Sequence, residues 1–171
     1  ILGLSEALRG LNREMAGSRT DMMKGMYRAI QSGFTSPDEF MPIAKSAMRL
    51  RTASGREINT TKSADAISVI RNALGVKSGR EGFVTDMLLR GRDVGRFELN
   101  EMTSALGIPL TIYGNQFSKR IGSEETLRQV VALLASSTQA GLSPTRSATG
   151  LRRLVEKTML LGNKAGGSGK N

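Results

Sequence analysis

Residues 139–157, with the sequence QAGLSPTRSATGLRRLVEK, decide the fold that we expect for this chain. Gly141 has no Cβ and takes a positive φ at little cost, which suits the residue just past the end of a helix. Ser143 is a favourable N-cap, and Pro144 suits the first helical position, where its missing N–H costs no hydrogen bond. One helix is therefore predicted to end here and another to begin at once.

The same punctuation recurs at residues 33–37 (GFTSP), where Ser36 and Glu39 have the spacing of a capping box. Between such corners the apolar residues recur at helical spacing, and no alternating run of β-branched residues is present. The sequence therefore predicts an all-α fold of seven or eight helices, each of about 10–20 residues. Helices of this length need packing partners, so we expect them to pack as hairpins or as a compact bundle.

The expected helices follow the apolar stripes, on which most of the nine methionines fall as core residues. A first helical region covers about residues 4–31, with a second start at Thr20 or Asp21. The remaining helices are expected over residues 36–55, 61–74, 81–90, 97–106, 109–120, 123–141 and 144–162. The run 91–95 (GRDVG) is interpreted as a loop, and Gly114 as an interruption of a weak helix.

Composition divides the chain into three parts. Residues 1–26 are interpreted as an N-terminal helical segment that can continue a longer chain, and residues 27–162 as the main helical domain. Residues 163–171 include the run GGSGKN, which is typical of a flexible Gly/Ser linker or tail. The longest strongly apolar run, residues 130–135, is far shorter than the roughly 20 residues that cross a bilayer, so no membrane span is expected.

No enzymatic chemistry is predicted, and neither a cofactor nor a metal site. The chain has no cysteine and no histidine, which removes thiolate and imidazole chemistry. Glu98 and Glu101 share a helix face but are expected to be solvent-exposed, and Glu124 with Glu125 fits the first turn of a helix. The glycine-rich run 75–82 lacks both the spacing of a phosphate-binding loop and a preceding strand.

The charge leaves one candidate site. The formal net charge is +10, with 25 Lys and Arg against 15 Asp and Glu. The residues that crowd the last predicted helix are Arg146, Arg152, Arg153 and Lys157. Their spacing puts Arg146, Arg153 and Lys157 near one face, where they are candidates for contact with an anion or a nucleic acid. A solvated helix back is the competing interpretation, and no aromatic residues interleave to stack on bases.

Two stretches resemble the helical domain of phage tail tape measure proteins. In the first, residues 141–144 (GLSP) are followed by residues 148–154 (ATGLRRL), after the Ala-, Leu- and Ser-rich run 130–137 (VVALLASS). These are similar to the G-L-S and A-T-x-L-R-x-L runs of that family. The second stretch, residues 27–34 (YRAIQSGF), is similar to the family's Y-x-A-x-x-x-G opening. The resemblance covers roughly residues 27–158.

The resemblance implies a virion structural protein that is threaded through the tail tube, sets tail length during assembly and leaves ahead of the DNA. It implies a place in the virion tail after assembly in the bacterial cytoplasm. The partners it implies are the tail tube, the tail tip and assembly chaperones, with self-association as a further candidate. Residues 27–162 would then be a tape-measure-like domain, although their corners depart from the rod expected of a ruler. A basic all-α nucleic-acid-binding module with weak DNA contact is the alternative.

Overall fold

The structure is a computed structural model that describes the backbone of residues 19–166. This part of the chain folds into helices joined by short corners, with no strand among them. The helices are α2 (Arg19–Gln31), α3 (Pro37–Ala53), α4 (Thr60–Leu74), α5 (Glu81–Gly95), α6 (Leu99–Ile121), α7 (Ser123–Gln139) and α8 (Pro144–Gly166). The all-α prediction is therefore confirmed.

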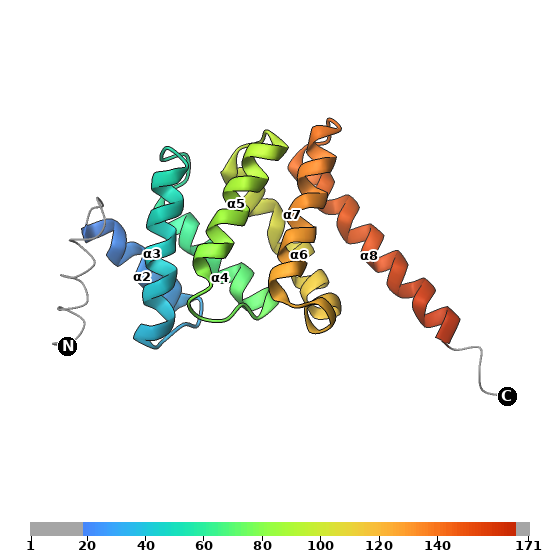
Figure 1. Cartoon of the computed structure of the whole chain (residues 1–171), viewed down its shortest axis with the longest axis horizontal. Helices are drawn as coiled ribbons and strands as arrows, with labels where there is room; N and C mark the ends of the chain where they lie inside the picture. The colour runs from blue at the N-terminus through green and yellow to red at the C-terminus, as the bar shows by residue number, and fades with distance from the viewer. Residues whose placement is uncertain (1–18, 167–171) are drawn as a thin grey trace.

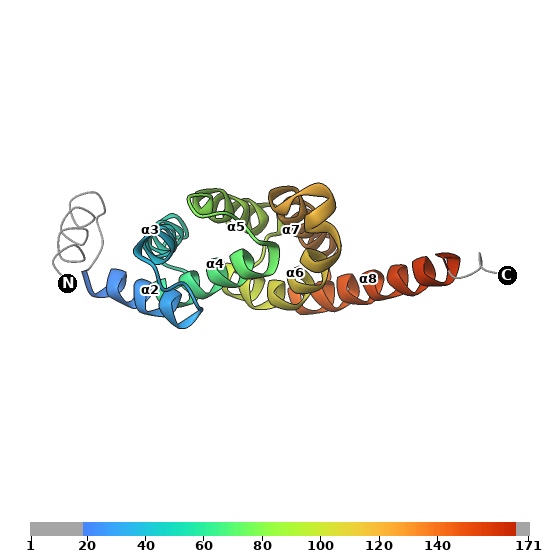
Figure 2. The same ribbon diagram turned by 90° about the horizontal axis from the view of Figure 1, so that it is seen from below.

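The helices stack in two parallel rows (Figure 2). Helices α2, α4, α6 and α8 lie side by side in one row, and α3, α5 and α7 in the other. Each helix packs on the next one in its own row and on its neighbour in the opposite row. Of the two predicted arrangements the structure has the array of hairpins, which is the architecture of an α-solenoid. Helices α2 and α8 lie at opposite ends of the array, and α8 projects away from it (Figure 1).

Several helices begin and end at the residues that the sequence predicts. The backbone N–H and the hydroxyl of Ser36 both donate to the carboxylate of Glu39, at 3.5 and 3.0 Å, before α3 begins at Pro37. Gly75 ends α4 with a φ of +67°, and Gly141 follows α7 with a φ of +90°. Both values lie in the left-handed region that glycine adopts without a Cβ penalty. The second start predicted at Thr20 or Asp21 falls at the edge of the described residues, where the chain is already helical from Arg19.

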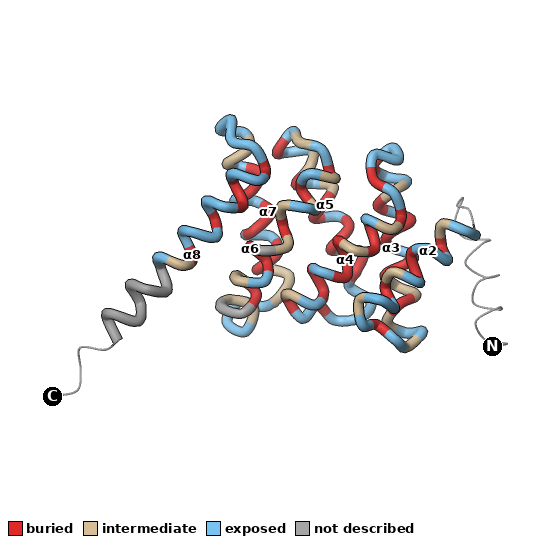
Figure 3. The backbone as a smooth tube through the Cα atoms, turned by 180° about the vertical axis from the view of Figure 1, so that it is seen from behind, coloured by how far each residue is buried: buried red, intermediate tan, exposed pale blue. Residues whose placement is uncertain are grey.

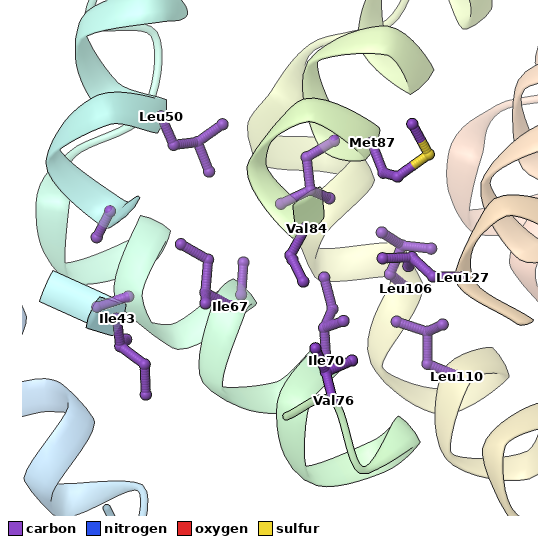
Figure 4. Packing of buried hydrophobic residues seen from close by; sticks show 14 of the residues in the cluster. Ile43, Leu50, Ile67, Ile70, Val76, Val84, Met87, Leu106, Leu110 and Leu127 are labelled. Carbon is purple, nitrogen blue, oxygen red and sulfur yellow. The ribbon is translucent and has the colours of Figure 1, made fainter. Parts of the chain in front are cut away.

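One continuous apolar core runs between the two rows (Figure 4). It takes Ile43 from α3, Ile67 from α4, Val84 from α5, Leu110 from α6 and Leu127 from α7. Figure 3 shows the same pattern along the chain, with buried positions recurring on the inner side of each helix. Among the methionines, Met22, Met26, Met48, Met87 and Met102 are buried, Met41 is half-buried, Met23 is exposed, and the side chains of Met15 and Met159 lie outside the described residues.

The loop predicted at residues 91–95 is wrong, because these residues form the last turns of α5. Gly91 and Gly95 lie one helical turn apart and are both buried. A Cβ at Gly91 would lie 2.6 Å from both Met102 Cε and Val131 Cγ1, and one at Gly95 would overlap the ring of Phe97. Glycine here permits the close approach of α6 and α7 rather than a turn. The chain turns one residue later, at Arg96, with a φ of +53°.

The two helices predicted around Pro109 are a single helix, α6. Proline removes the hydrogen bond to the carbonyl four residues earlier and crowds that carbonyl, but packing against α4, α7 and α8 stabilises the continuous helix. Gly114 does not interrupt it either, because α6 runs through this position. The residue is a glycine for packing, since a Cβ there would overlap the carbonyl oxygen of Ala73 at the end of α4.

The predicted end of the last helix at Gly162 is also wrong, because α8 continues to Gly166.

The boundaries predicted between the three parts fall within helices. Helix α2 runs across residues 26 and 27, and α8 runs past residue 163 to Gly166. Residues 167–171 of the predicted linker and most of the N-terminal segment lie outside the described residues. None of the described helices combines the length and the apolar character that crossing a membrane requires.

Candidate functional site

The four basic residues predicted as a candidate site all lie on α8, the last helix of the array. Its start is set by the corner at Gly141: the N–H of Leu142 donates to Ser137 O at 3.2 Å, which closes the end of α7. Pro144 then opens α8, and the N–H of Arg146 reaches Ser143 Oγ at 3.4 Å. This N-cap contact is long, so the proline and the packing of the helix fix its direction.

Packing divides α8 into two faces. Ala148, Leu151 and Val155 are buried, at positions that share one side of the helix, and α8 packs through that side on α6 and α7. Successive residues are about 100° apart around a helix, so residues 146, 153 and 157 fall on the opposite side. Arg146, Arg153 and Lys157 are indeed exposed. The predicted common face of these three residues is present.

Arg152 does not share that face. Its Nε lies 2.7 Å from Glu156 Oε1, one turn along the helix, and this hydrogen bond raises the pKa of the guanidinium above its usual value. It also lines a cavity of about 210 Å³ between α6 and α8. The other lining residues are Ser104, Ala105, Pro109, Thr145, Ala148 and Thr149. Three of the four predicted residues, Arg146, Arg153 and Lys157, therefore form one cationic face, which we call the α8 basic face. The fourth, Arg152, is already paired with Glu156.

The acidic side chains elsewhere are largely engaged with arginines. Those that form an ion pair within 4 Å are Asp21, Glu57, Asp65, Glu81, Asp93, Glu124, Glu125 and Glu156. The surplus of positive charge is thus carried by other lysines and arginines, with the α8 basic face among them. Along the helix its members are spaced by about 10 and 6 Å, so the face can contact successive negative groups on an extended anionic partner.

The carboxylate pairs show no arrangement for acid–base chemistry. Glu98 and Glu101 are both exposed. Glu124 accepts hydrogen bonds from Arg80 Nε and Nη2 at 2.5 and 2.7 Å, which lower the pKa of its carboxyl group below the usual value. Glu125 lies 3.5 Å from Arg128. In the described part of the chain no three acidic residues converge as metal ligands.

The glycine-rich run 75–82 connects α4 to α5, so it follows a helix and not a strand. Arg80 and Glu124 join this connection to the start of α7 beside a cavity of about 540 Å³. Two arginines and two glutamates line that cavity and pair with each other. The arrangement is that of an exposed structural ion-pair cluster and not of a phosphate site.

Sequence reasoning missed a buried ion pair. Arg71 of α4 lies 2.9 Å from Glu81 of α5, and the two side chains are 6% and 1% exposed. The Arg71 guanidinium also donates to the carbonyl oxygens of Val76 and Glu39, and it lies 4.5 Å from the centre of the Phe34 ring. The apolar stripe of α4 gives no sign of this, because the partners come from two corners and from two other helices, α3 and α5.

A second feature that was missed is an exposed apolar stripe on α2. Met23, Tyr27 and Ile30 are 53%, 64% and 42% exposed, although most of the methionines were expected to be core residues. Their spacing of four and three residues puts them on one side of the helix. The core side of α2 is instead made by Met22, Gly25, Met26 and Ala29.

Comparison with known proteins gives one match. The model of the family described as phage-related minor tail protein matches residues 5–169. No curated protein matches the chain. No solved structure matches it.

Proposed function

Because the chain belongs to the phage-related minor tail protein family, we propose that it is a helical module of a tail tape measure protein. The observation that carries this proposal is the family match over residues 5–169 together with the motif likeness at residues 141–154. The module would be a structural, non-enzymatic part of the virion tail. Its partners would be other tail proteins, namely the tail tube, the tail tip and the chaperones of tail assembly.

The fold argues for a particular part of that role. As one continuous helix, residues 19–166 would extend about 220 Å, because a helix rises 1.5 Å per residue. Folded in two rows, these residues do not reach that length, since the longest helices have 23 residues, or about 35 Å. We propose that this module contributes packing contacts during tail assembly and DNA ejection, while extended helical regions of the parent protein set the length.

Deleting the module from the gene of its phage or prophage tests both parts of the proposal. We expect defective or fewer tails, and those that form should be shortened by far less than 220 Å. An in-frame deletion of equal length in a heptad-rich region of the same protein is the control, and it should shorten tails by close to the full helical length. Normal tail yield and length after deletion of the module would contradict a role in assembly, and shortening by the full helical length would show that the module itself measures.

The α8 basic face favours a second candidate function, contact with DNA. Its three exposed cations belong to α8, the helix that projects from one end of the array (Figure 1), where an extended polyanion has access to them. Such binding would depend steeply on salt, since each phosphate contact releases counterions. Absence of binding to duplex DNA even at low salt would exclude this function.

A further inference from the structure

The cavity of about 210 Å³ between α6 and α8 is built around a proline. Pro109 and Ala105, four residues apart on α6, both line it, and Pro109 is buried. Proline has no N–H, so the carbonyl oxygen of Ala105 lacks the hydrogen bond that residue 109 would give it in a regular helix. A backbone acceptor without its helical partner therefore lies at the wall of the cavity.

Two hydroxyl groups at the cavity are also left as acceptors. Ser104 Oγ donates to Asn100 O at 2.8 Å, and Thr149 Oγ1 donates to Thr145 O at 2.9 Å. A hydroxyl has a single hydrogen, so each oxygen that donates within its own helix keeps lone pairs for a ligand. Together with the Ala105 carbonyl, these groups make the walls of the cavity rich in hydrogen-bond acceptors.

Arg152 supplies the donors of the same cavity. Among the described residues its guanidinium donates through Nε, to Glu156 Oε1 at 2.7 Å, which leaves the Nη groups for a ligand. Glu156 balances the positive charge of Arg152, so the pair carries no net charge. Pro109 and Ala148 are both buried and add apolar surface to the lining.

A primary amide is the ligand that matches this combination of groups. Its NH₂ group donates to acceptors such as the Ala105 carbonyl, and its own carbonyl accepts from an Arg152 Nη. A carboxylate of the same shape would bring its oxygens against the acceptors and toward Glu156, and an ammonium group would lie against the Arg152 guanidinium. Both charged groups are disfavoured, because a polar group left unpaired on binding costs free energy.

The size of the cavity indicates a single side chain as the occupant. Pockets for small molecules and cofactors measure about 300–1,000 Å³, whereas this cavity measures about 210 Å³. Ser104 and Thr149 are exposed, so a group on another molecule can enter between the two helices. We propose that the cavity between α6 and α8 receives the side-chain amide of an Asn or Gln residue of a partner protein. The inference rests on the packing role proposed above only in taking that partner to be a tail protein.

Titration of the isotope-labelled whole chain with propanamide, followed by NMR, tests the class of ligand. We expect saturable shifts of the backbone amide signals of Ala105 and Thr149, with a Kd on the order of 10 mM for so small a ligand. Propanoate and propylammonium have a similar shape and should bind at least about tenfold more weakly. Equal affinity for the three probes, or no saturation with propanamide, would overturn the proposal.

Pro109→Ala tests the role of the Ala105 carbonyl without filling the cavity. The alanine supplies an N–H to that carbonyl, so the affinity for propanamide should fall at least about fivefold while the thermal midpoint does not fall. Pro42→Ala makes the same change inside α3, away from the cavity, and is the matched control that should leave the affinity unchanged. An unchanged affinity in Pro109→Ala would overturn the proposed site.

Two capped tripeptides separate a protein partner from a free small amide. Acetyl-Ala-Gln-Ala-N-methylamide should bind at least as tightly as propanamide, and the same peptide with Glu in place of Gln should bind about tenfold more weakly. Binding of propanamide without binding of the Gln peptide would overturn the protein partner in favour of a free amide. These titrations are independent of the deletion experiment in the phage. Normal tails together with intact amide binding would contradict the tail role alone, and defective tails without amide binding would contradict this inference alone.

Discussion

Arg71 Nη1 and Glu81 Oε1 lie 2.9 Å apart with almost no exposed side-chain surface, at the point where α4, α5 and the start of α3 meet. The contact is a charge pair without the alignment of a hydrogen bond, since Glu81 Oε1 has no hydrogen-bond partner. Arg71 also satisfies two carbonyl oxygens. The pair therefore positions three elements, and each charge depends on the other for compensation.

Removing one member of this pair should be strongly destabilising. We expect Glu81→Ala to lower the free energy of unfolding by about 3–5 kcal/mol, because it leaves a buried guanidinium uncompensated. Urea denaturation followed by circular dichroism measures this. Glu156→Ala, which breaks the exposed pair with Arg152, is the control and should have little effect. If both variants unfold at the wild-type midpoint, the buried pair is not structural.

Two glycines of α6 should respond in opposite directions to alanine. Gly114→Ala places a Cβ against the backbone of Ala73 and should cost about 1–3 kcal/mol, because that backbone cannot move aside freely. Gly107→Ala meets no atom within 4 Å and should stabilise the fold by about 0.4–1 kcal/mol. Thermal or urea unfolding of the two variants tests both signs, and equal shifts would contradict the close approach of α4 and α6.

The α8 basic face makes a prediction about salt dependence. If it contacts DNA phosphates, changing Arg146, Arg153 and Lys157 to Gln should reduce the slope of log K against log salt by about 3. Fluorescence anisotropy with a labelled duplex between low and physiological salt measures this slope. Arg152→Gln is the matched control on the same helix, and it should change the slope less because Arg152 pairs with Glu156. An equal change for all four positions would show that the face has no special role.

The stability of the fold at acid pH should depend on the ion pair between Arg80 and Glu124. The hydrogen bond from Arg80 lowers the pKa of Glu124 in the folded protein below its usual value of 4.5. The folded state thus gains stability above the unfolded pKa and loses it as the pH falls through the folded pKa. Glu124→Gln should be less stable than wild type near neutral pH and should approach it in acid. Arg80→Met should have the same effect, and the double variant should add little.

The corners of this fold are predictable from local sequence, since each depends on residues within one helical turn. Ser36 with Glu39, and Gly141 before Ser143 and Pro144, act through their own backbone and side chains. A glycine in the sequence is ambiguous, because it can either end a helix or allow two helices to approach closely. Gly75 ends a helix, whereas Gly91 lies inside one, and the difference depends on Met102 and Val131, far away in the sequence.

The candidate site, like the fold, was predictable only where it depends on local sequence. The common face of Arg146, Arg153 and Lys157 follows from helical spacing alone. The pairing of Arg152 was not foreseen, although Glu156 stands four residues away, at the spacing of an ion pair along one helix. The order of stacking in two rows depends on contacts between distant segments and has no local sequence signature.

The stacking in two rows also has a mechanical meaning. Each helix is held by its immediate neighbours, and α2 and α8 sit at opposite ends of the array. A pull on these two helices is therefore transmitted in series, since none of the helices described between residues 19 and 166 spans the whole array. Because the stability of such an array is a sum over neighbouring units, we expect it to unfold under tension unit by unit and not all at once.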